Sequence, residues 1–578
     1  MGKNIRTFIQ NQALKIFIWT VWLGVNIYLF TDTYLLYRNS DKYHYLYMLL
    51  KDSICLSRAC AMALNFNCAL ILIPMCRTVN SFVRTKILKY IHSNPRRLIN
   101  HMKGLHIMCA FTICVLGVTH SLSHLVNVMR FRMNYTKVVE DLNPNKNSKE
   151  DTTLWFFLTE VAGWSGIVML LVLSAVVLTS FQAVRRKHYE IFWYTHHLSL
   201  CFLILVGIHG LGGITKWQSN LNEHPRRCQS LDYKTWMNKT MHCEPPKFEP
   251  NGAQTWKWLI GPFCLYIIDR IIRWYRATRN VTIAKVTLHE GRVIELHMLK
   301  KGFKAKPGHY ILVQCPDIAE FEWHAFTLSK IPTAKEGDAA TFSVHIKVTG
   351  NWTELLKELL LESCEENGVE LKRVGDSCVM KVDAEWTESA CRGALPIIRV
   401  DGPYGSPNED SFRYPVNVSV AAGIGITPFA CVLNYLKYLD PTNLNKKFKM
   451  KRIYLVWVCR DIKEFTWFLE LMSDTVKHLE SINMPDMLVC HLYVTRDSKL
   501  TTDDPSMIDQ RMQWFQKRLN YGRPKFDEIL KTIAQSYNKT RIGVFFCGPN
   551  PLAHALYEAC TVTKDRENSF IFHKESFA

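Results

Sequence analysis

Acidic residues are scarce in this 578-residue sequence: 51 aspartates and glutamates accompany 71 lysines and arginines, and the formal net charge is +20. An excess of this size is typical of proteins that bind nucleic acid or a membrane surface. Because the basic residues lie beside long apolar runs, the charge indicates a membrane surface, and we expect no nucleic-acid partner. The chain is also too long for one ordinary domain.

We also expect no cleavable signal peptide. The first apolar run, residues 13–30, ends in polar and aromatic residues instead of a small-residue cleavage site, so we interpret it as a retained membrane span. Five further runs come close to the roughly 20 residues that cross a bilayer. They cover residues 56–76, 105–126, 154–179, 191–211 and 258–274.

The connections between the runs predict the orientation of the chain. Short basic connections stay on the cytosolic side of a membrane, and the segment between the second and third runs contains no acidic residue. Six spans then place both termini in the cytosol, in a multi-pass protein of the plasma membrane or of an endomembrane. The basic residues of this segment are Arg77, Arg84, Lys86, Lys89, Arg96, Arg97 and Lys103.

The opposite connections carry features of an outside or lumenal face. The sequons Asn134-Tyr135-Thr136 and Asn238-Lys239-Thr240 are acceptor sites for glycosylation. Cys228 and Cys243 flank the second sequon, and we expect them to form a disulfide, because this face is oxidising.

Histidines inside the apolar runs are the main functional signal, since ionisable residues within a span are costly and are functional by default. His106 and His120 lie in the third run, and His196 and His209 lie in the fifth. On ideal helices the members of each pair are about 20 Å apart along the axis. Both runs cross in the same direction, so His106 lies level with His196, and His120 with His209. Each level offers two imidazoles from facing helices, which is the axial ligand set of a six-coordinate haem iron.

One spacing does not suit an ideal helix. The step from His196 to His209 rotates the side chain by about 220°, whereas the step from His106 to His120 returns it to nearly the same face. Either the fifth helix is bent or bulged, or His197 replaces His196 as the ligand.

Two further residues lie near the outer histidine level. His124 is one turn beyond His120, so we expect it to face the outer haem. Arg58 lies near the outer end of the second run. The plainer interpretation of Arg58 is an arginine that extends to the interface; we favour a partner for haem propionates or for a reduced oxygen species.

The second half of the chain has the pattern of a two-part soluble module. From residue 281 to 400, short β-rich runs separated by turn signals predict a small antiparallel barrel. From 401 to 578, strands alternate with helices, which predicts a parallel sheet. The predicted strands are 281–288, 292–298, 310–314 and 342–348 in the barrel, and 416–421, 452–458, 488–495 and 542–546 in the parallel sheet.

A glycine-rich turn follows the first strand of the predicted parallel sheet. Gly423 and Gly425 permit a tight turn and the close approach of a pyrophosphate, and Thr427 caps the next helix. A full GxGxxG is lacking, so this motif is weak alone; the segment Cys547-Gly548-Pro549, which ends a later strand, strengthens it. Arg460 follows the second strand, where a dinucleotide fold reads the 2′-phosphate, and it favours NADPH over NADH.

Together these features resemble the catalytic transmembrane subunit of the NADPH oxidase family, and the resemblance covers essentially every segment. His324-Ala325-Phe326-Thr327-Leu328 resembles the flavin motif, with Ala325 where the family has proline. Gly350-Asn351-Trp352-Thr353 resembles the FAD phosphate segment, with Asn351 where an acid is usual. Asp401-Gly402-Pro403-Tyr404-Gly405 resembles a nicotinamide-nucleotide motif, and Phe577 resembles the terminal aromatic residue that covers the flavin.

The resemblance implies a multidomain oxidoreductase. Its expected parts are a six-helix transmembrane bis-haem bundle over residues 1–280, an antiparallel β-barrel FAD domain over 281–400 and an α/β parallel-sheet NADPH domain over 401–578. The last two parts form a cytosolic ferredoxin-reductase-like module. The implied cofactors are two b-type haems, FAD and NADPH, and the implied acceptor is O2, which gives superoxide or hydrogen peroxide. A small membrane partner subunit of the p22-phox type is also implied.

Within the family the chain most resembles the constitutively active member that releases hydrogen peroxide, on segments such as Tyr43-His44-Tyr45-Leu46 and Pro74-Met75-Cys76-Arg77-Thr78. Direct peroxide release requires that superoxide be held and protonated. We predict that the last outside connection does both: Arg226 and Arg227 attract the anion, and His224 donates a proton. The plainer interpretation of His224 is an ordinary exposed histidine in a glycosylated loop.

Two other functions fit parts of the sequence. A ferric-chelate reductase has the same architecture but delivers its electrons to a metal ion. A proton channel is a different class of protein, and it would need neither the nucleotide motifs nor haem.

Overall fold

The chain packs into two compact units, each of which is described by itself. The computed structural model describes residues 5–88, 96–134, 142, 158–229, 244–289, 291–332, 341–366, 372–374, 377–381, 395–440, 448–496, 510–563 and 568–575. Ile16–Cys76 and His101–Arg270 form the first unit, here called the helical unit. Met1–Lys15, Arg77–Asn100 and Ile271–Ala578 form the second, here called the sheet unit.

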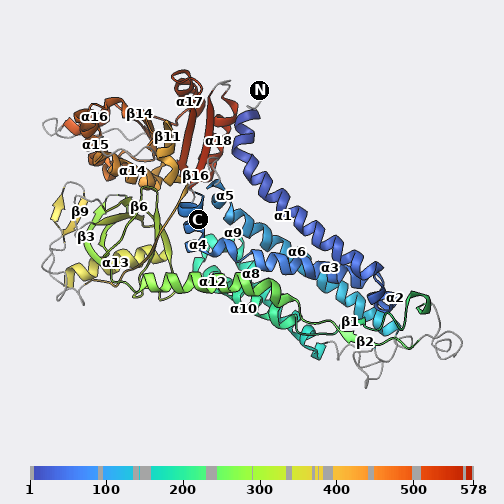
Figure 1. Ribbon diagram of the computed structural model, residues 1–578. Coiled ribbons are helices and arrows are strands. Elements are labelled where there is room, and N and C mark those ends of the chain that lie inside the picture. The colour runs from blue at the N-terminus through green and yellow to red at the C-terminus, as the bar shows by residue number, and fades with distance from the viewer. Residues whose placement is uncertain are drawn as a thin grey trace. The chain divides into compact units, whose positions relative to one another are not determined.

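Five helices among the described residues are long and apolar enough to cross a membrane, and they coincide with the first five predicted spans. The chain is therefore a multi-pass membrane protein. In Figure 1 the five helices are α1 (Ile5–Asn39), α3 (Asp52–Leu70), α6 (Met102–Met133), α8 (Val161–Ser180) and α10 (Tyr189–His209).

The sixth predicted span is helical but more charged. Helix α12 (Thr255–Ala277) covers the predicted run, yet it also carries Asp269, Arg270 and Arg273. It is not among the five helices that satisfy the length and hydropathy requirements. Its role as a membrane span therefore stays a prediction.

Helix pairs build the helical unit. Helix α3 packs along α6, and α8 packs along α10. Small buried residues of α3, such as Ala59 and Ala63, permit close approach, which is the usual packing of membrane helices. The amide of Asn67 joins α3 to α1: its nitrogen donates to Asn26 Oδ1 at 2.6 Å, and its oxygen accepts from Trp22 Nε1 at 3.1 Å.

An antiparallel sheet of eight strands follows α12, as the sequence predicts for the first soluble part. Its spatial order is β10-β5-β6-β7-β4-β3-β9-β8. Helix α13 (Asn351–Glu366) buries Trp352, Leu356 and Leu360 in the core of this sheet. The strands are β3 (Thr282–His289), β4 (Val293–Leu299), β5 (Tyr310–Gln314), β6 (His324–Lys330), β7 (Phe342–Lys347), β8 (Lys372–Val374), β9 (Ser377–Lys381) and β10 (Arg399–Tyr404).

The second soluble part is a parallel sheet with helices on both faces, drawn from yellow-orange to red in Figure 1. The spatial order β14-β13-β12-β11-β15-β16 confirms the α/β prediction. One apolar core includes residues of α14 and α15, and a separate one includes residues of α17 and α18. The strands are β11 (Val416–Ala422), β12 (Arg452–Cys459), β13 (Leu488–Val494), β14 (Leu519–Tyr521), β15 (Arg541–Cys547) and β16 (Ser569–Glu575); the helices are α14 (Thr427–Lys437), α15 (Leu469–Ser481), α17 (Phe526–Gln535) and α18 (Asn550–Val562).

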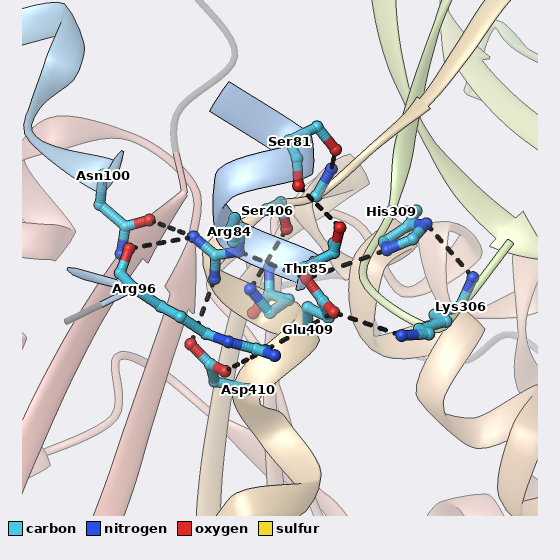
Figure 2. A network of polar contacts seen from close by, with 12 residues as sticks. Ser81, Arg84, Thr85, Arg96, Asn100, Lys306, His309, Ser406, Glu409 and Asp410 are labelled. Carbon is cyan, nitrogen blue, oxygen red and sulfur yellow. Dashed lines mark hydrogen bonds and ion pairs between the residues drawn. The ribbon is translucent and has the colours of Figure 1, made fainter. Parts of the chain in front are cut away.

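The basic segment between the second and third predicted spans forms ion pairs with acidic residues more than 300 positions later in the chain. Figure 2 shows Arg84 and Arg96 beside Glu409 and Asp410, which lie in the 3-10 helix Pro407–Arg413. Arg84 Nη2 and Arg96 Nη1 each lie 3.1 Å from an oxygen of Asp410, and Arg84 Nε lies 3.3 Å from Glu409 Oε2. All four side chains are at least 95% buried. Ion pairs thus join the segment Arg77–Asn100 to the rest of the sheet unit.

The start of the chain joins the same unit. Asn11 lies beside β16: its side-chain nitrogen donates to the carbonyl of Phe570 at 3.0 Å, and its side-chain oxygen accepts from the backbone N–H of Phe572 at 2.9 Å. Gln12 Nε2 donates to the hydroxyl of Tyr557 at 2.6 Å. The beginning of α1 therefore packs on the parallel sheet that ends the chain.

Candidate functional site

The structure brings the four predicted axial histidines together in two pairs. His106 of α6 faces His196 of α10, with ring centroids 6.2 Å apart. His120 of α6 faces His209 of α10, with ring centroids 6.1 Å apart. Helix α10 contains both of its histidines and is continuous from Tyr189 to His209, its last residue. These are the two pairings that the axial spacing predicts.

The pairing resolves which histidine of α10 faces the inner partner. His196 faces His106, and His197 does not replace it. The Nδ1 of His197 instead lies 2.7 Å from the carbonyl of Trp193, one turn earlier on the same helix, at an exposed position. The structure therefore favours His196 over His197 at the inner level, and ligation by His196 stays a prediction.

Hydrogen bonds orient three of the four imidazoles for metal ligation. His106 Nδ1 lies 3.1 Å from the carbonyl of Ile71, and His120 Nδ1 lies 2.9 Å from that of Ser57. His209 Nδ1 lies 3.1 Å from Ser165 Oγ, whose hydroxyl donates to the carbonyl of Val161 and so accepts from the ring. Carbonyls only accept, so Nδ1 carries the proton and Nε2 keeps the lone pair that binds a metal.

The spacing of the rings fits a metal ion between them. Two imidazoles that ligate one metal ion, each through a bond of about 2 Å, place their ring centroids roughly 6 Å apart. Both observed separations have this value. The Nδ1 of His196 is buried without a hydrogen-bond partner among the described residues, so this ring depends least on the protein for its orientation.

His124 and Arg58 lie at the outer pair, as the sequence predicts. The ring of His124 is 4.5 Å from that of His120. Arg58 is near enough to His120, His124 and His209 to act on them electrostatically. Its Nε donates to the hydroxyl of Tyr37 at 3.1 Å, and its role at the outer histidine level stays a prediction.

His224 is not the exposed histidine of the plainer interpretation. It is fully buried, with Nδ1 2.7 Å from the carbonyl of Glu244 and Nε2 2.6 Å from the hydroxyl of Tyr45. Because the carbonyl only accepts, Nδ1 carries a proton, and a neutral ring accepts from the Tyr45 hydroxyl through Nε2.

The cationic residues of this connection are only partly described. Arg226 is exposed and lies 3.6 Å from Asp41, whereas the side chain of Arg227 lies outside the described residues. Cys228 is buried and disulfide-bonded. Its predicted partner Cys243 lies outside the described residues, so the pairing stays a prediction.

The predicted flavin motif lies in strand β6, and the predicted FAD phosphate segment begins helix α13. The ring of Trp352 stacks on that of His324, with centroids 4.2 Å apart, and lies 6.2 Å from that of Phe326. Thr353 Oγ1 accepts from the backbone N–H of Gly350 at 3.1 Å, which closes the turn before the helix. The buried Trp352 Nε1 has no hydrogen-bond partner among the described residues, so it is available to a ligand. Phe577 lies outside the described residues.

Glu575, at the end of β16, is a site residue that sequence reasoning missed. Its carboxylate accepts from Ser406 Oγ at 3.1 Å and from Asn408 Nδ2. Burial raises the pKa of Glu575 to about 8, although Ser406, Arg84 and Thr327 of the flavin motif oppose the rise. The only available signal was an acid that ends an apolar run close to the end of the chain.

Asp401 ties the Gly402-Pro403 motif to the end of α12. Arg273 Nε lies 2.8 Å from one oxygen of Asp401, and Arg276 Nη2 lies 2.9 Å from the other. The hydroxyl of Tyr404 donates to Asp401 at 2.5 Å. This anchor was also missed, because the two arginines precede Asp401 by more than 120 residues.

The two predicted nucleotide turns meet at the carboxyl edge of the parallel sheet. Strands β11 and β15 are parallel neighbours, so Gly423 and Gly425 follow one strand where Gly548 follows the other. A Cβ on Gly425 would lie only 2.3 Å from the carbonyl oxygen of Cys547, so only glycine fits at this crossing. Thr427 and Pro428 are the first two residues of α14, so the prediction that Thr427 caps this helix is wrong: Ile426 is the N-cap residue, and no side chain caps the helix. The N-terminus of α14 still favours a phosphate.

Arg460 lies where a dinucleotide fold reads the ribose. It directly follows β12, the parallel neighbour of β11, and its side chain is exposed at the same carboxyl edge. The nucleotide turns and Arg460 therefore lie at the same edge of the sheet, and their binding of a nucleotide stays a prediction.

Three family profiles match the chain. They are described as "Ferric reductase like transmembrane component" over residues 63–207, "FAD-binding domain" over 278–408 and "Ferric reductase NAD binding domain" over 414–561. Among solved structures, the ferredoxin-NADP+ reductase of Plasmodium falciparum matches 51% of this chain and 95% of its own, with 16% identity and a TM-score of 0.30.

Full-length relatives also match. Human NADPH oxidase 4 is 36% identical and both chains are covered completely. NADPH oxidase 1 of Mus musculus is 34% identical over 99% of this chain and 95% of its own, and human NADPH oxidase 3 is 34% identical over 99% of each. The resemblance inferred from the motifs is thus confirmed: the chain belongs to the NADPH oxidase family.

Proposed function

We propose that this NADPH oxidase moves electrons from NADPH, bound at the edge of the parallel sheet, through FAD and two b-type haems to O2 at the opposite face of the membrane. When bound, FAD accepts hydride from NADPH, and the haems pass single electrons onward. The balance is one NADPH and two O2 to NADP+, one proton and two superoxide ions. The observation that carries the proposal is the pair of facing histidine levels in the helical unit.

At the nucleotide end, the chain's own residues bind and select. The turns at Gly423–Gly425 and Cys547–Pro549 admit the pyrophosphate to the N-terminus of α14. Arg460 offers a cation to the 2′-phosphate, which explains a preference for NADPH.

In the flavin region, aromatic stacking and a protonated acid define the site. Trp352, with His324 and Phe326, supplies an aromatic wall beside the turn that Gly350 and Thr353 close at the start of α13. Since burial raises the pKa of Glu575 to about 8, its carboxyl group holds a proton at neutral pH.

Within the helical unit, His106 with His196 would hold the inner haem, and His120 with His209 the outer one. The hydrogen bonds of His106 and His120 to the backbone carbonyls of α3 and its C-terminal turn fix the tautomer that ligates through Nε2. His124, whose ring is 4.5 Å from that of His120, and Arg58 would then lie beside the outer haem, where Arg58 would offer a cation to propionates or to superoxide.

The connection that contains His224 and Cys228 supports hydrogen peroxide as a direct product. The hydrogen bond between His224 and Tyr45 holds a proton donor in a folded, disulfide-bonded segment. Protons delivered there favour conversion of superoxide to peroxide before release.

The composition of the sheet unit supports the proposed orientation. The start of the chain, the basic segment Arg77–Asn100 and the end of the chain all pack with the nucleotide-binding part. We therefore place both termini in the cytosol with NADPH. A small membrane partner subunit of the p22-phox type is proposed on family resemblance; unchanged activity and stability of the chain expressed without such a subunit would contradict it.

The proposal is tested on purified protein that contains haem and FAD. The reduced-minus-oxidised spectrum should show low-spin haem at two per chain, and NADPH should drive dye reduction that superoxide dismutase or catalase abolishes. Iron-chelate reduction that is insensitive to both enzymes, with no O2 consumption, would identify a metal reductase instead.

A further inference from the structure

Three strands of the antiparallel sheet bring two histidines and a glutamate together outside the motifs described above. His289 ends β3, Glu295 lies on β4 and His345 lies on β7, where the register pairs it directly with Glu295. The Nε2 atoms of His289 and His345 lie 3.0 Å and 3.7 Å from the same carboxylate oxygen, Oε2 of Glu295. One ligand atom from each residue lies within 4.8 Å of the others.

The Nε2 atom of His345 points into this cluster and lacks a hydrogen bond. Its side chain is 2% exposed, and its Nε2 has no hydrogen-bond partner among the described residues. The 3.7 Å to Glu295 is too long for a hydrogen bond. Buried polar atoms are almost always satisfied, so an orphaned ring nitrogen that faces a carboxylate indicates a missing ligand.

Hydrogen bonds from neighbouring residues hold the side chains of His345 and Glu295 in place. The other nitrogen of His345, Nδ1, lies 2.8 Å from Ser329 Oγ, which in turn lies 2.9 Å from Ser343 Oγ. The second oxygen of Glu295, Oε1, lies 2.7 Å from Nε2 of His297. Metal-bound imidazoles and carboxylates are typically oriented in this way by their second polar atom.

We propose that His289, Glu295 and His345 bind one divalent first-row transition-metal ion, with Zn²⁺ as the best fit. Two imidazoles and a carboxylate suit zinc and exclude magnesium and calcium, which prefer oxygen ligands. Ligand atoms of a tetrahedral site with bonds of about 2.1 Å lie roughly 3.4 Å apart. The 3.0 and 3.7 Å separations lie on either side of this value, and water completes the coordination.

The metal ion would fasten the antiparallel sheet at its contact with the nucleotide-binding part. It joins β3, β4 and β7 through one residue each. The ring of Phe468, which precedes α15, lies 4.4 Å from the ring of His345. Zinc has no redox chemistry, so it acts on the stability of this contact and leaves the electron route unchanged.

The test measures zinc bound to the full-length, untagged protein with its haem and FAD. The protein is freed of loosely held metal by dialysis, given Zn²⁺ alone, desalted and analysed for zinc by mass spectrometry, normalised to haem. We expect about one zinc per chain in the wild type. His345→Ala and Glu295→Gln should each lower the bound zinc at least tenfold. His491→Ala, a partly buried histidine of β13 outside the cluster, is the matched control and should keep its zinc.

Zinc below about one tenth per chain in the wild type, or zinc retained in both variants, would overturn the proposal. Glu295→Gln keeps the side-chain shape, so it covers the case in which His345→Ala fails to fold. X-ray absorption at the zinc edge gives an independent readout on the wild type. Only nitrogen and oxygen ligands, with two imidazoles, are expected, and any sulfur ligand would place the ion elsewhere.

Discussion

Replacing Arg84 by alanine should destabilise the sheet unit strongly. Arg84 is 1% exposed and contacts Glu409 at 3.3 Å, Asp410 at 3.1 Å and Asn100 at 2.7 Å. Its loss leaves two buried carboxylates beside one buried cation, Arg96, and the more exposed Arg413 and Lys306. Breaking a buried ion pair from one side costs about 3–5 kcal/mol. We expect the lower end of this range, about 3 kcal/mol, because Arg96 still contacts both carboxylates.

Arg413→Ala is the matched control for this prediction. Arg413 contacts the same carboxylate, Asp410, at 3.3 Å, but its side chain is 36% exposed, so its loss should cost at most about 1 kcal/mol. The assay is thermal release of FAD from the purified protein, followed by flavin fluorescence, with haem absorbance as a check that the helical unit is intact. Equal effects of the two substitutions would refute the reasoning, because burial would then not determine the contribution of each arginine.

The remaining predictions concern single residues of the site. Because the pKa of Glu575 is raised by burial from 4.5 to about 8, the folded protein binds one more proton than the unfolded chain between these values. Stability should therefore fall by about 1.4 kcal/mol per pH unit from pH 6 to 8 in the wild type, and Glu575→Gln should abolish that fall in FAD-release temperature. Arg460→Ala should raise the Michaelis constant for NADPH about tenfold or more and that for NADH less than twofold; equal effects on both would make the arginine structural. His224→Ala should raise the ratio of superoxide to hydrogen peroxide, measured with paired superoxide and peroxide assays, and an unchanged ratio would exclude His224 from proton delivery.

The sequence predicts elements whose signal is local. Apolar runs of the right length identify five membrane helices, and a short β-rich run that follows a turn signal gives β5 at its observed bounds, Tyr310–Gln314. The histidine pairing follows as well, because helical rise alone places His106 and His120 at the levels of their partners.

Long-range packing explains what the sequence could not predict. Strands β6 and β10 were missed because polar site residues interrupt their apolar pattern. The contact between Arg84 and Asp410 joins residues 326 positions apart. The burial of His224 depends on Tyr45, which is 179 positions away, so no local pattern distinguishes it from an exposed histidine.

Haem content of His120→Leu tests the central claim most directly, because leucine keeps the bulk of the side chain but cannot ligate iron. His197→Leu is the matched control, since His197 bonds only to its own helix in the pairing observed. The account predicts that His120→Leu loses the outer haem and NADPH-driven O2 reduction while FAD is still reduced, and that His197→Leu keeps two haems per chain. Two haems with an unchanged spectrum in His120→Leu would contradict it.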